Sequence, residues 1–280
     1  MKNSIYPCLT LKNKVAEAAD FYINTFGEGK IIQTTHYVIV IELSGQKLML
    51  LNEGPSSQPN AAISFMVISE EPEETERYWN KLTDGGKIFM PLDSYPWSVK
   101  YGWVEDQYGV SWQLFTGSKN AAGQKFCPSF MFTGANTGKA TSAVHFYTSL
   151  FPNSSVENIL EYGKNDGDIP GLVKHAQFKI NDFIVTAMDS SADHRVAFTD
   201  ALSFVVNCDT QAEIDNYWDA LTANGGQEVA CGWLIDKYGV SWQIVPKILE
   251  ELMKNPERAE RVMNALVRMK KLIIADLENA

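Results

Sequence analysis

The sequence contains one polar pattern twice. DQYGVSWQ occupies Asp106 to Gln113 and DKYGVSWQ occupies Asp236 to Gln243, so seven of eight positions are identical at a separation of 130 residues. Each copy ends in a glutamine, whose side chain offers both a hydrogen-bond acceptor and a donor. A glutamine buried on a sheet face needs partners, either from the protein or from a bound molecule. Gln113 and Gln243 are therefore candidates for two equivalent binding sites.

The rest of each octapeptide is typical of a turn followed by a strand. The Asp carboxylate can accept backbone N–H groups, and the Gly three residues later can adopt a positive φ. Alternation along the strand then predicts two faces. One face carries Val110, Trp112 and Leu114, or Val240, Trp242 and Ile244; the other carries Ser111, Gln113 and Phe115, or Ser241, Gln243 and Val245. We expect the tryptophan face to meet helices and the glutamine face to look into the concave side of a sheet.

The separation of the two copies fits a whole small domain, so the repeat indicates domain duplication. Each half shows the order strand, helix, strand, strand, strand, performed twice. The predicted helices are residues 15–26, 72–82, 140–151 and 211–221, and the predicted strands include residues 31–43, 47–51, 61–68, 130–132, 173–180, 183–188 and 202–206. The halves differ most before the octapeptide, where sixteen positions separate Gly86 from Gly102 but six separate Gly226 from Gly232.

Composition along the chain predicts the domain boundaries. We expect a first domain at residues 1–117, a small polar linker at 118–124, a second domain at 125–246 and a C-terminal helical tail at 247–280. In the tail, Asn255 can cap a helix that begins at Pro256. An apolar stripe predicts one helix that docks through a single face; its residues are Val262, Leu266, Met269, Ile273 and Leu277.

The charge balance favours a small molecule or a protein as the partner. The net charge is −10 and the isoelectric point is near 4.9, whereas nucleic acids and anionic membranes bind clustered Lys and Arg. No apolar run is long enough to cross a bilayer, and the first residues lack the apolar core of a signal peptide, so we expect a cytoplasmic protein. The four cysteines form no C-x-x-C pair and are predicted to be reduced thiols: Cys8, Cys127, Cys208 and Cys231.

Two longer stretches carry a family resemblance. W-x-x-x-Y-G-W-V-x-D-x-Y-G-V-S-W-Q at Trp97 to Gln113 and C-G-W-L-x-D-x-Y-G-V-S-W-Q-I-V-P at Cys231 to Pro246 resemble the PhnB-like branch of the vicinal oxygen chelate superfamily. That superfamily includes glyoxalase I, bleomycin-resistance proteins and extradiol dioxygenases. The resemblance implies an α+β fold of two tandem glyoxalase-like domains, each with two βαβββ modules whose curved mixed sheets enclose a cavity. It also implies an internal pseudo-dimer of domains, and the chain could form a homodimer.

The resemblance also bears on metal binding. Metal-dependent members of the superfamily place His or Glu ligands on the first and last strands of their modules, and the last-strand Glu corresponds to Gln113 and to Gln243. The other ligand positions fall in segments without His, Asp or Glu: residues 9–11, 48–50, 63–65, 130–132, 186–188 and 202–204. A neutral amide is a weak ligand for zinc, nickel or iron without imidazole or carboxylate support. We therefore expect no catalytic metal.

Members of this branch are often described as demethylubiquinone methyltransferases, which would require a methyl donor. The sequence offers no glycine-rich turn between a strand and a helix of the kind that holds a nucleotide-like cofactor. Gly27-Glu28-Gly29-Lys30 lacks the length and the Ser or Thr of a phosphate loop. We therefore expect no cofactor.

The candidate ligand-binding residues fall into two sets. The first-domain set is Glu42, Ser64, Trp97, Tyr101 and Gln113, with Trp97 on the longer hairpin as a lid or stacking surface; the second-domain set is His175, Gln177, Ser203 and Gln243. Three functions stay open. The chain could bind a small, partly apolar molecule in one or both cavities without a metal. It could be a metal-independent or weakly metal-dependent enzyme that acts on a small metabolite, or a structural module with closed cavities.

Overall fold

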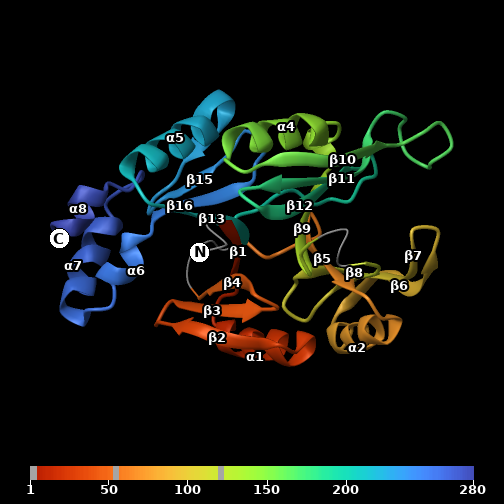
Figure 1. Cartoon of the computed structure of the whole chain (residues 1–280), viewed down its shortest axis with the longest axis horizontal. Coiled ribbons are helices and arrows are strands. Elements are labelled where there is room, and N and C mark those ends of the chain that lie inside the picture. Colours follow the sequence, from red (N-terminus) through yellow and green to blue (C-terminus); the bar gives the residue numbers. More distant parts are fainter. Residues whose placement is uncertain (1–4, 53–56, 119–122) are drawn as a thin grey trace. The chain divides into compact units, whose positions relative to one another are not determined.

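The computed structural model describes residues 5–52, 57–118 and 123–280 (Figure 1). The chain divides into two compact units, a larger one made of Pro7–Leu202 and a smaller one made of Met1–Tyr6 and Ser203–Ala280. Residues 119–122 of the predicted linker lie outside the described residues. Within the described ranges, no helix is both long and apolar enough to cross a membrane.

One strand order recurs four times along the chain. In each module the first strand pairs in parallel with the fourth, and the fourth, third and second strands continue as an antiparallel ribbon. The strands are, module by module, β1 (Ile5–Thr10), β2 (Gly29–Thr34), β3 (Val38–Leu43) and β4 (Gln46–Leu51); β5 (Ile63–Ser69), β6 (Lys87–Tyr95), β7 (Ser98–Glu105) and β8 (Ser111–Thr116); β9 (Phe126–Phe132), β10 (Ser155–Glu161), β11 (Val173–Ile180) and β12 (Phe183–Asp189); β13 (Leu202–Cys208), β14 (Gln227–Glu228), β15 (Trp233–Ile235) and β16 (Ser241–Pro246). The predicted duplication of a two-module domain is confirmed.

The second and third modules share one sheet, which lies wholly within the larger unit. β5 pairs with β9 in antiparallel register, with Ser64 opposite Ser129. The eight strands run in the order β10-β11-β12-β9-β5-β8-β7-β6. A strand of the first domain and a strand of the second domain therefore meet at the centre of this sheet. The predicted α+β fold with mixed sheets is confirmed.

Each module carries one helix after its first strand: α1 (Val15–Phe26), α2 (Pro72–Leu82), α4 (Ala140–Leu150) and α5 (Gln211–Thr222). The predicted helix ends agree with these bounds to within one residue. Local signals set the starts, since Pro72 stands in the first turn of α2 and Thr210 with Glu213 forms a capping box before α5. In Figure 1, α4 lies along the strands β10 and β11, on which it packs. One face of the shared sheet is thus covered by helices.

The Asp of the first octapeptide organises its turn. Asp106 Oδ1 accepts the backbone N–H groups of Tyr108 and Val110 at 2.8 and 3.0 Å. Its Oδ2 accepts the Trp112 indole N–H at 2.8 Å and the Tyr22 hydroxyl at 3.0 Å. Burial raises the pKa of Asp106, and the hydrogen bonds, with the Trp112 indole bond foremost, act in the opposite direction. The carboxylate therefore joins the turn, the following strand and α1.

The second octapeptide repeats this geometry. Asp236 accepts the backbone N–H groups two and four residues further on, at 2.9 and 3.0 Å, and the Trp242 indole N–H at 2.9 Å. Gly109 and Gly239 both adopt a positive φ, of 83° and 93°, in the turn. The predicted turn role of Asp and Gly is confirmed in both copies.

The tryptophan face of β8 packs against helix α1. Trp112 is buried, and its ring lies 4.9 Å from that of Phe26, 5.3 Å from that of Tyr22 and 5.1 Å from that of Phe65. Burying such a ring typically stabilises a fold by about 2 to 3 kcal/mol. The prediction that this face meets helices is confirmed. Gln113 consequently projects from the opposite face of the strand.

Two strands differ from the sequence prediction. The apolar run at residues 31–43 forms the two strands β2 and β3, because the Thr35 N–H and hydroxyl both bond to the Val38 carbonyl and close a turn. β10 was not predicted. Six of its seven residues are exposed at the edge of the sheet, so it shows no alternation of apolar residues.

The tail consists of three short helices, and the prediction of one docking helix is wrong. They are α6 (Ile248–Leu252), α7 (Pro256–Leu266) and α8 (Ile274–Glu278). The predicted cap is confirmed, because the Asn255 side chain accepts the first backbone N–H groups of α7. The chain leaves helical structure after α7, which lets residues from separate segments form a small core: Leu252, Val262, Leu272 and Leu277.

The tail is anchored within the smaller unit by backbone hydrogen bonds. The carbonyl groups of Met269 and Lys270 accept the N–H groups of Cys231 and Gly232, each at 2.8 Å. The Gln211 side chain bonds to the backbone on both sides of residue 273. The segment before the second octapeptide is therefore held by the tail.

None of the four cysteines forms a disulfide bond, so all are thiols, as predicted. Cys8, Cys127 and Cys208 are buried, whereas Cys231 is half-buried. Burial raises the pKa of the Cys127 and Cys208 thiols to about 12. These thiols are therefore protonated packing residues at neutral pH.

Candidate functional site

A row of uncharged polar side chains crosses the face of the shared sheet that is opposite Trp112. Strand register aligns its members on neighbouring strands, because paired residues point to the same side of a sheet. The row runs through Gln177, Thr186, Ser129, Ser64 and Ser111 on β11, β12, β9, β5 and β8. We call these residues, together with Gln113, the polar row. It spans both domains at the β5–β9 seam.

Gln113 bonds to side chains on two neighbouring strands. Its Nε2 donates to Ser64 Oγ at 2.6 Å, and its Oε1 accepts the Tyr101 hydroxyl at 2.8 Å. The adjacent Ser111 Oγ accepts the Trp103 indole N–H at 2.7 Å. Gln113 is buried, and burial raises the pKa of the Tyr101 hydroxyl, which therefore stays protonated as a donor. At this end of the row the side-chain polar groups bond to one another.

The long β6–β7 hairpin extends this network with aromatic rings. Trp97 stacks on Tyr95 with ring centroids 5.1 Å apart and lies edge-on to Tyr101 at 5.7 Å. Trp97 is 52% exposed, so half of its surface remains accessible. The predicted first-domain residues Ser64, Trp97, Tyr101 and Gln113 are therefore brought together by the structure.

The second octapeptide carries a smaller network. Gln243 Nε2 donates to Ser203 Oγ at 2.9 Å, as its counterpart does to Ser64. Ser241 lies on the same face, opposite Ser203 in the β13–β16 ladder. Trp233 pairs with Gln243 across β15 and β16 and is half-buried. The two predicted residues Ser203 and Gln243 are thus in direct contact in the smaller unit.

The remaining candidates lie elsewhere. His175 and Gln177 are two positions apart on β11, so both point to the polar-row face of the shared sheet, whereas Ser203 and Gln243 lie on strands of the other sheet. Burial lowers the pKa of His175, which is therefore neutral near pH 7. Glu42 lies on β3, where it forms an ion pair with Lys30 at 3.2 Å. It does not belong to the polar row.

Sequence reasoning missed three members of the polar row: Ser111, Ser129 and Thr186. Ser111 was assigned to the correct face but not to the site. The other two enter through the β5–β9 and β9–β12 ladders, which join distant parts of the chain. Aligning the four modules would have revealed them, since first-strand serines precede a Phe in three modules. These are Ser64, Ser129 and Ser203.

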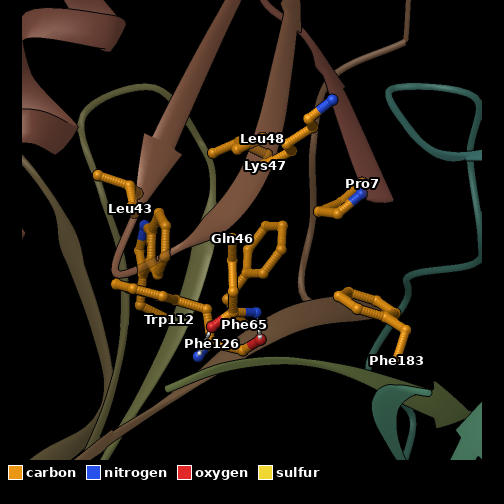
Figure 2. Close-up of a pocket in the computed structure, with 9 residues that line it drawn as sticks. All are labelled: Pro7, Leu43, Gln46, Lys47, Leu48, Phe65, Trp112, Phe126 and Phe183. Atoms are coloured by element: carbon orange, nitrogen blue, oxygen red, sulfur yellow. Dashed lines mark hydrogen bonds between the residues drawn. The ribbon is translucent and has the colours of Figure 1, made fainter. Parts of the chain in front are cut away.

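A separate apolar hollow lies on the helix side of the sheet (Figure 2). It contains about 310 Å³ of empty space, including the part open to solvent. Its polar lining residue Gln46 donates to the Phe126 carbonyl at 2.8 Å and accepts the Phe126 N–H at 2.9 Å, as the dashed lines in Figure 2 show. Lys47 points away from that amide. Gln46 therefore ties β4 to β9, and the hollow has a structural role.

A buried ion pair stands near the start of β9. The Lys125 ammonium group contacts Glu74 at 2.9 Å and the Tyr78 hydroxyl at 2.8 Å, and Tyr78 itself donates to Glu74 at 2.6 Å. Burial and the Glu74 carboxylate raise the pKa of Tyr78. Because all three groups satisfy one another, this cluster fastens the start of the second domain to α2.

The fold and the duplication of its domain agree with comparisons to known proteins. A family model described as 3-demethylubiquinone-9 3-methyltransferase matches residues 3–115 and residues 124–245. Glyoxalase I from Zea mays aligns over 89% of this chain and 94% of its own, with a TM-score of 0.61 and 12% identity. A putative 3-demethylubiquinone-9 3-methyltransferase, PhnB protein, from Bacillus cereus is 32% identical and covers 40% of this chain and 98% of its own, with a TM-score of 0.39.

One curated relative shares a shorter stretch. Protein YjdN of Escherichia coli strain K12 is 27% identical over 75 residues, which is 26% of this chain. The aligned stretch spans about half of that protein, 51% of its length. The fold is that of glyoxalase I. The chain belongs to the family described as 3-demethylubiquinone-9 3-methyltransferase, with two copies of its domain, so the predicted resemblance is confirmed.

The polar row does not suit a transition metal. Its side-chain donors are hydroxyls and amides, and both amide atoms of Gln113 already bond to protein groups. Among the residues whose placement is described, no group of three or more His, Cys, Asp and Glu side chains could hold a metal ion. Zinc, nickel and iron sites in proteins rely on imidazole, thiolate and carboxylate ligands. The polar row therefore offers neutral hydrogen-bond donors and acceptors.

Proposed function

We propose that the protein binds small, uncharged, partly apolar organic molecules on the glutamine faces of its sheets, without a catalytic metal. The observation that carries this proposal is the polar row, a continuous line of neutral donors and acceptors that crosses both domains at the β5–β9 seam. Neutral groups fixed in a sheet orient a ligand through hydrogen bonds, while apolar neighbours provide affinity. Ile68, Cys127 and Ile184 form such an apolar cluster next to the row.

The aromatic hairpin supports a planar ligand. The exposed face of Trp97 stands beside Tyr101, which is bonded to Gln113. Stacking on an indole and hydrogen bonding to a neighbouring amide select flat molecules with polar edges. A phenol or quinone ring, the type of acceptor named in the family description, has this form. Methyl transfer is not part of the proposal, because Gly27 follows the C-terminal end of α1 and so offers no helix N-terminus to a donor's anionic groups.

The enzyme hypothesis built on His175, Gln177, Ser203 and Gln243 draws on two networks. Gln177 belongs to the polar row of the larger unit, whereas Ser203 and Gln243 bond to each other in the smaller unit. The polar row supports binding most directly, because strand register aligns its neutral side chains.

A thermal-shift screen of the full chain tests this proposal. Ligands that bind only the folded state raise the unfolding temperature, by about 2.7 kcal/mol of stabilisation at one hundred times Kd. We expect hits among neutral phenols, quinones and planar antibiotics. Absence of any shift across such a metabolite and antibiotic library would refute ligand binding.

A matched pair of serine variants locates the site. Ser129→Ala removes the central hydroxyl of the polar row, which makes no hydrogen bond within the described part of the chain, so the fold should persist. Ser69→Ala removes a buried hydroxyl that also lacks a partner, but on the opposite face of β5. The shift should shrink in the Ser129→Ala variant and stay unchanged in the Ser69→Ala variant. Equal shifts in both variants would place the ligand elsewhere.

A further inference from the structure

Two polar atoms of the second octapeptide, Ser241 Oγ and Gln243 Oε1, lack the partners that their counterparts have in the first. Ser241 Oγ is buried and has no hydrogen-bond partner, whereas Ser111 Oγ accepts the Trp103 indole N–H. Gln243 Oε1 has no partner among residues 5–52, 57–118 and 123–280, whereas Gln113 Oε1 accepts the Tyr101 hydroxyl. The serine and glutamine side chains at aligned positions therefore differ in whether the protein supplies their hydrogen-bond partners.

This difference in hydrogen bonding arises from the residues just before each octapeptide. Cys231 stands at the position aligned with Tyr101, and a thiol side chain cannot extend as far as a phenol hydroxyl. Trp233 aligns with Trp103, yet its indole N–H makes no hydrogen bond to the residues that the structure describes. The tail holds this segment, because Met269 accepts the Cys231 N–H while Cys231 adopts a φ of 61°. The segment before the second octapeptide therefore supplies no hydrogen-bond partner to Ser241 Oγ or to Gln243 Oε1.

An unsatisfied buried hydroxyl lowers the stability of the folded protein, because it loses its hydrogen bonds to water. Native structures contain few such groups, and those that occur often mark functional positions. Ser241 is more than nine-tenths buried and shares its strand face with Gln243. A bound molecule that bonds to both side chains would remove this cost.

We propose that the second octapeptide binds an uncharged planar ligand in which an N–H group stands beside a carbonyl group, as in a cyclic amide. Gln243 Oε1 accepts the ligand N–H, and the Ser241 hydroxyl donates to the ligand carbonyl. The ring packs on the half-buried indole of Trp233 and on Val205, which pairs with Gln243. None of these side chains is charged, so an ionised ligand would be desolvated without compensation.

This inference rests on the proposed function and assigns a ligand class to its second site. The probe is 2-pyridone, a planar cyclic amide, titrated into the full chain and followed through the tryptophan indole N–H signals by NMR. N-methyl-2-pyridone is the matched control, because it keeps the ring and the carbonyl but lacks the N–H. We expect N-methyl-2-pyridone to bind roughly tenfold more weakly, as loss of one hydrogen bond predicts.

Two serine variants test the assignment of this site. Ser241→Ala should weaken 2-pyridone binding roughly fivefold to tenfold. It should leave the unfolding temperature equal to or above that of the wild type, because the lost hydroxyl has no partner. Ser69→Ala, which removes another buried hydroxyl without a partner but lies outside both glutamine networks, should leave 2-pyridone binding unchanged. Gln243→Leu provides a second test and should abolish the response of the Trp233 signal.

The outcomes distinguish this inference from the broader function. Equal binding of the two pyridones, or equal weakening in the Ser69→Ala and Ser241→Ala variants, would overturn the assignment. If 2-pyridone fails while other ligands give shifts that depend on Ser129, the inference is wrong and the proposed function stands. If no compound binds in either experiment, both are wrong.

Discussion

The two octapeptides differ less in sequence than in the state of their polar groups. Both use Asp to hold the turn and the following tryptophan, and both carry a bond from Gln to a first-strand serine. In the first copy, Tyr101 and Trp103 satisfy the remaining atoms; in the second copy, Cys231 and Trp233 do not. The shared residues therefore maintain the fold. The residues just before each octapeptide determine whether the polar atoms of its serine and glutamine have hydrogen-bond partners within the protein.

The largest expected effect concerns what the copies share. Asp106→Ala and Asp236→Ala should each reduce the free energy of unfolding by about 3 kcal/mol or more, because each leaves buried backbone and indole N–H groups without an acceptor. Thermal unfolding followed by circular dichroism measures this loss. If either variant retains wild-type stability, the Asp is not an architectural residue in that copy.

A substitution in the first copy should make it resemble the second. Tyr101→Phe removes the hydroxyl that Gln113 Oε1 accepts, so it should cost about 1 to 2 kcal/mol of stability. The freed acceptor should also give the first copy measurable affinity for 2-pyridone, detected as a response of the Trp103 indole signal. A stability loss without any new binding would show that an unsatisfied Gln is insufficient to make a site.

Alanine substitutions at Ser111 and Ser241 compare the hydrogen bonding of the two octapeptides directly. Ser111→Ala leaves the Trp103 indole N–H without its acceptor and should cost about 1 kcal/mol. Ser241→Ala removes a buried hydroxyl that has no partner, so stability should stay equal or rise slightly. Paired thermal melts at one protein concentration compare the two. Equal destabilisation would mean that Ser241 has a structural partner after all.

The smallest effect is a pH dependence confined to the larger unit. Burial lowers the pKa of His175 below its usual value of 6.5, so the unfolded chain binds the proton more tightly than the folded chain. Stability is therefore fully present above pH 6.5 and should fall by a few tenths of a kcal/mol to about 1 kcal/mol as the pH drops below that value. His175→Gln should flatten the curve in this range. An unchanged slope in the variant would assign the pH dependence to other groups.

The sequence predicted the architecture more fully than the site. Period and alternation placed four modules and both faces of the octapeptide, because these are local properties of helices and strands. Ser129 and Thr186 were missed because they join the polar row through pairing of β5, β9 and β12, which are distant in sequence. The change from Tyr101 to Cys231 was visible from the start. Its consequence was not, since it depends on whether a hydroxyl reaches the neighbouring amide.

The edge strand β10 and the tail were harder to predict for a related reason. β10 is held by backbone bonds to β11 while its side chains face solvent, so hydrophobic patterning carries no signal. In the tail, the apolar residues fit one helical stripe. The carbonyl groups of residues 269 and 270 nevertheless accept the N–H groups of Cys231 and Gly232, in the turn before β15, and no helix continues through them. In both segments, backbone hydrogen bonds to another part of the chain determine a structure that the pattern of apolar residues does not indicate.

Metal content is the most direct test of the central claim that the glutamine faces of this protein bind their ligand without a catalytic metal. The protein, purified without chelators and exposed to zinc, nickel and iron, would be analysed by inductively coupled plasma mass spectrometry, with Gln113→Leu and Gln243→Leu variants alongside. We predict far less than one ion per chain for the wild type. A near-stoichiometric zinc, nickel or iron content that falls when Gln113 or Gln243 is replaced by leucine would contradict it.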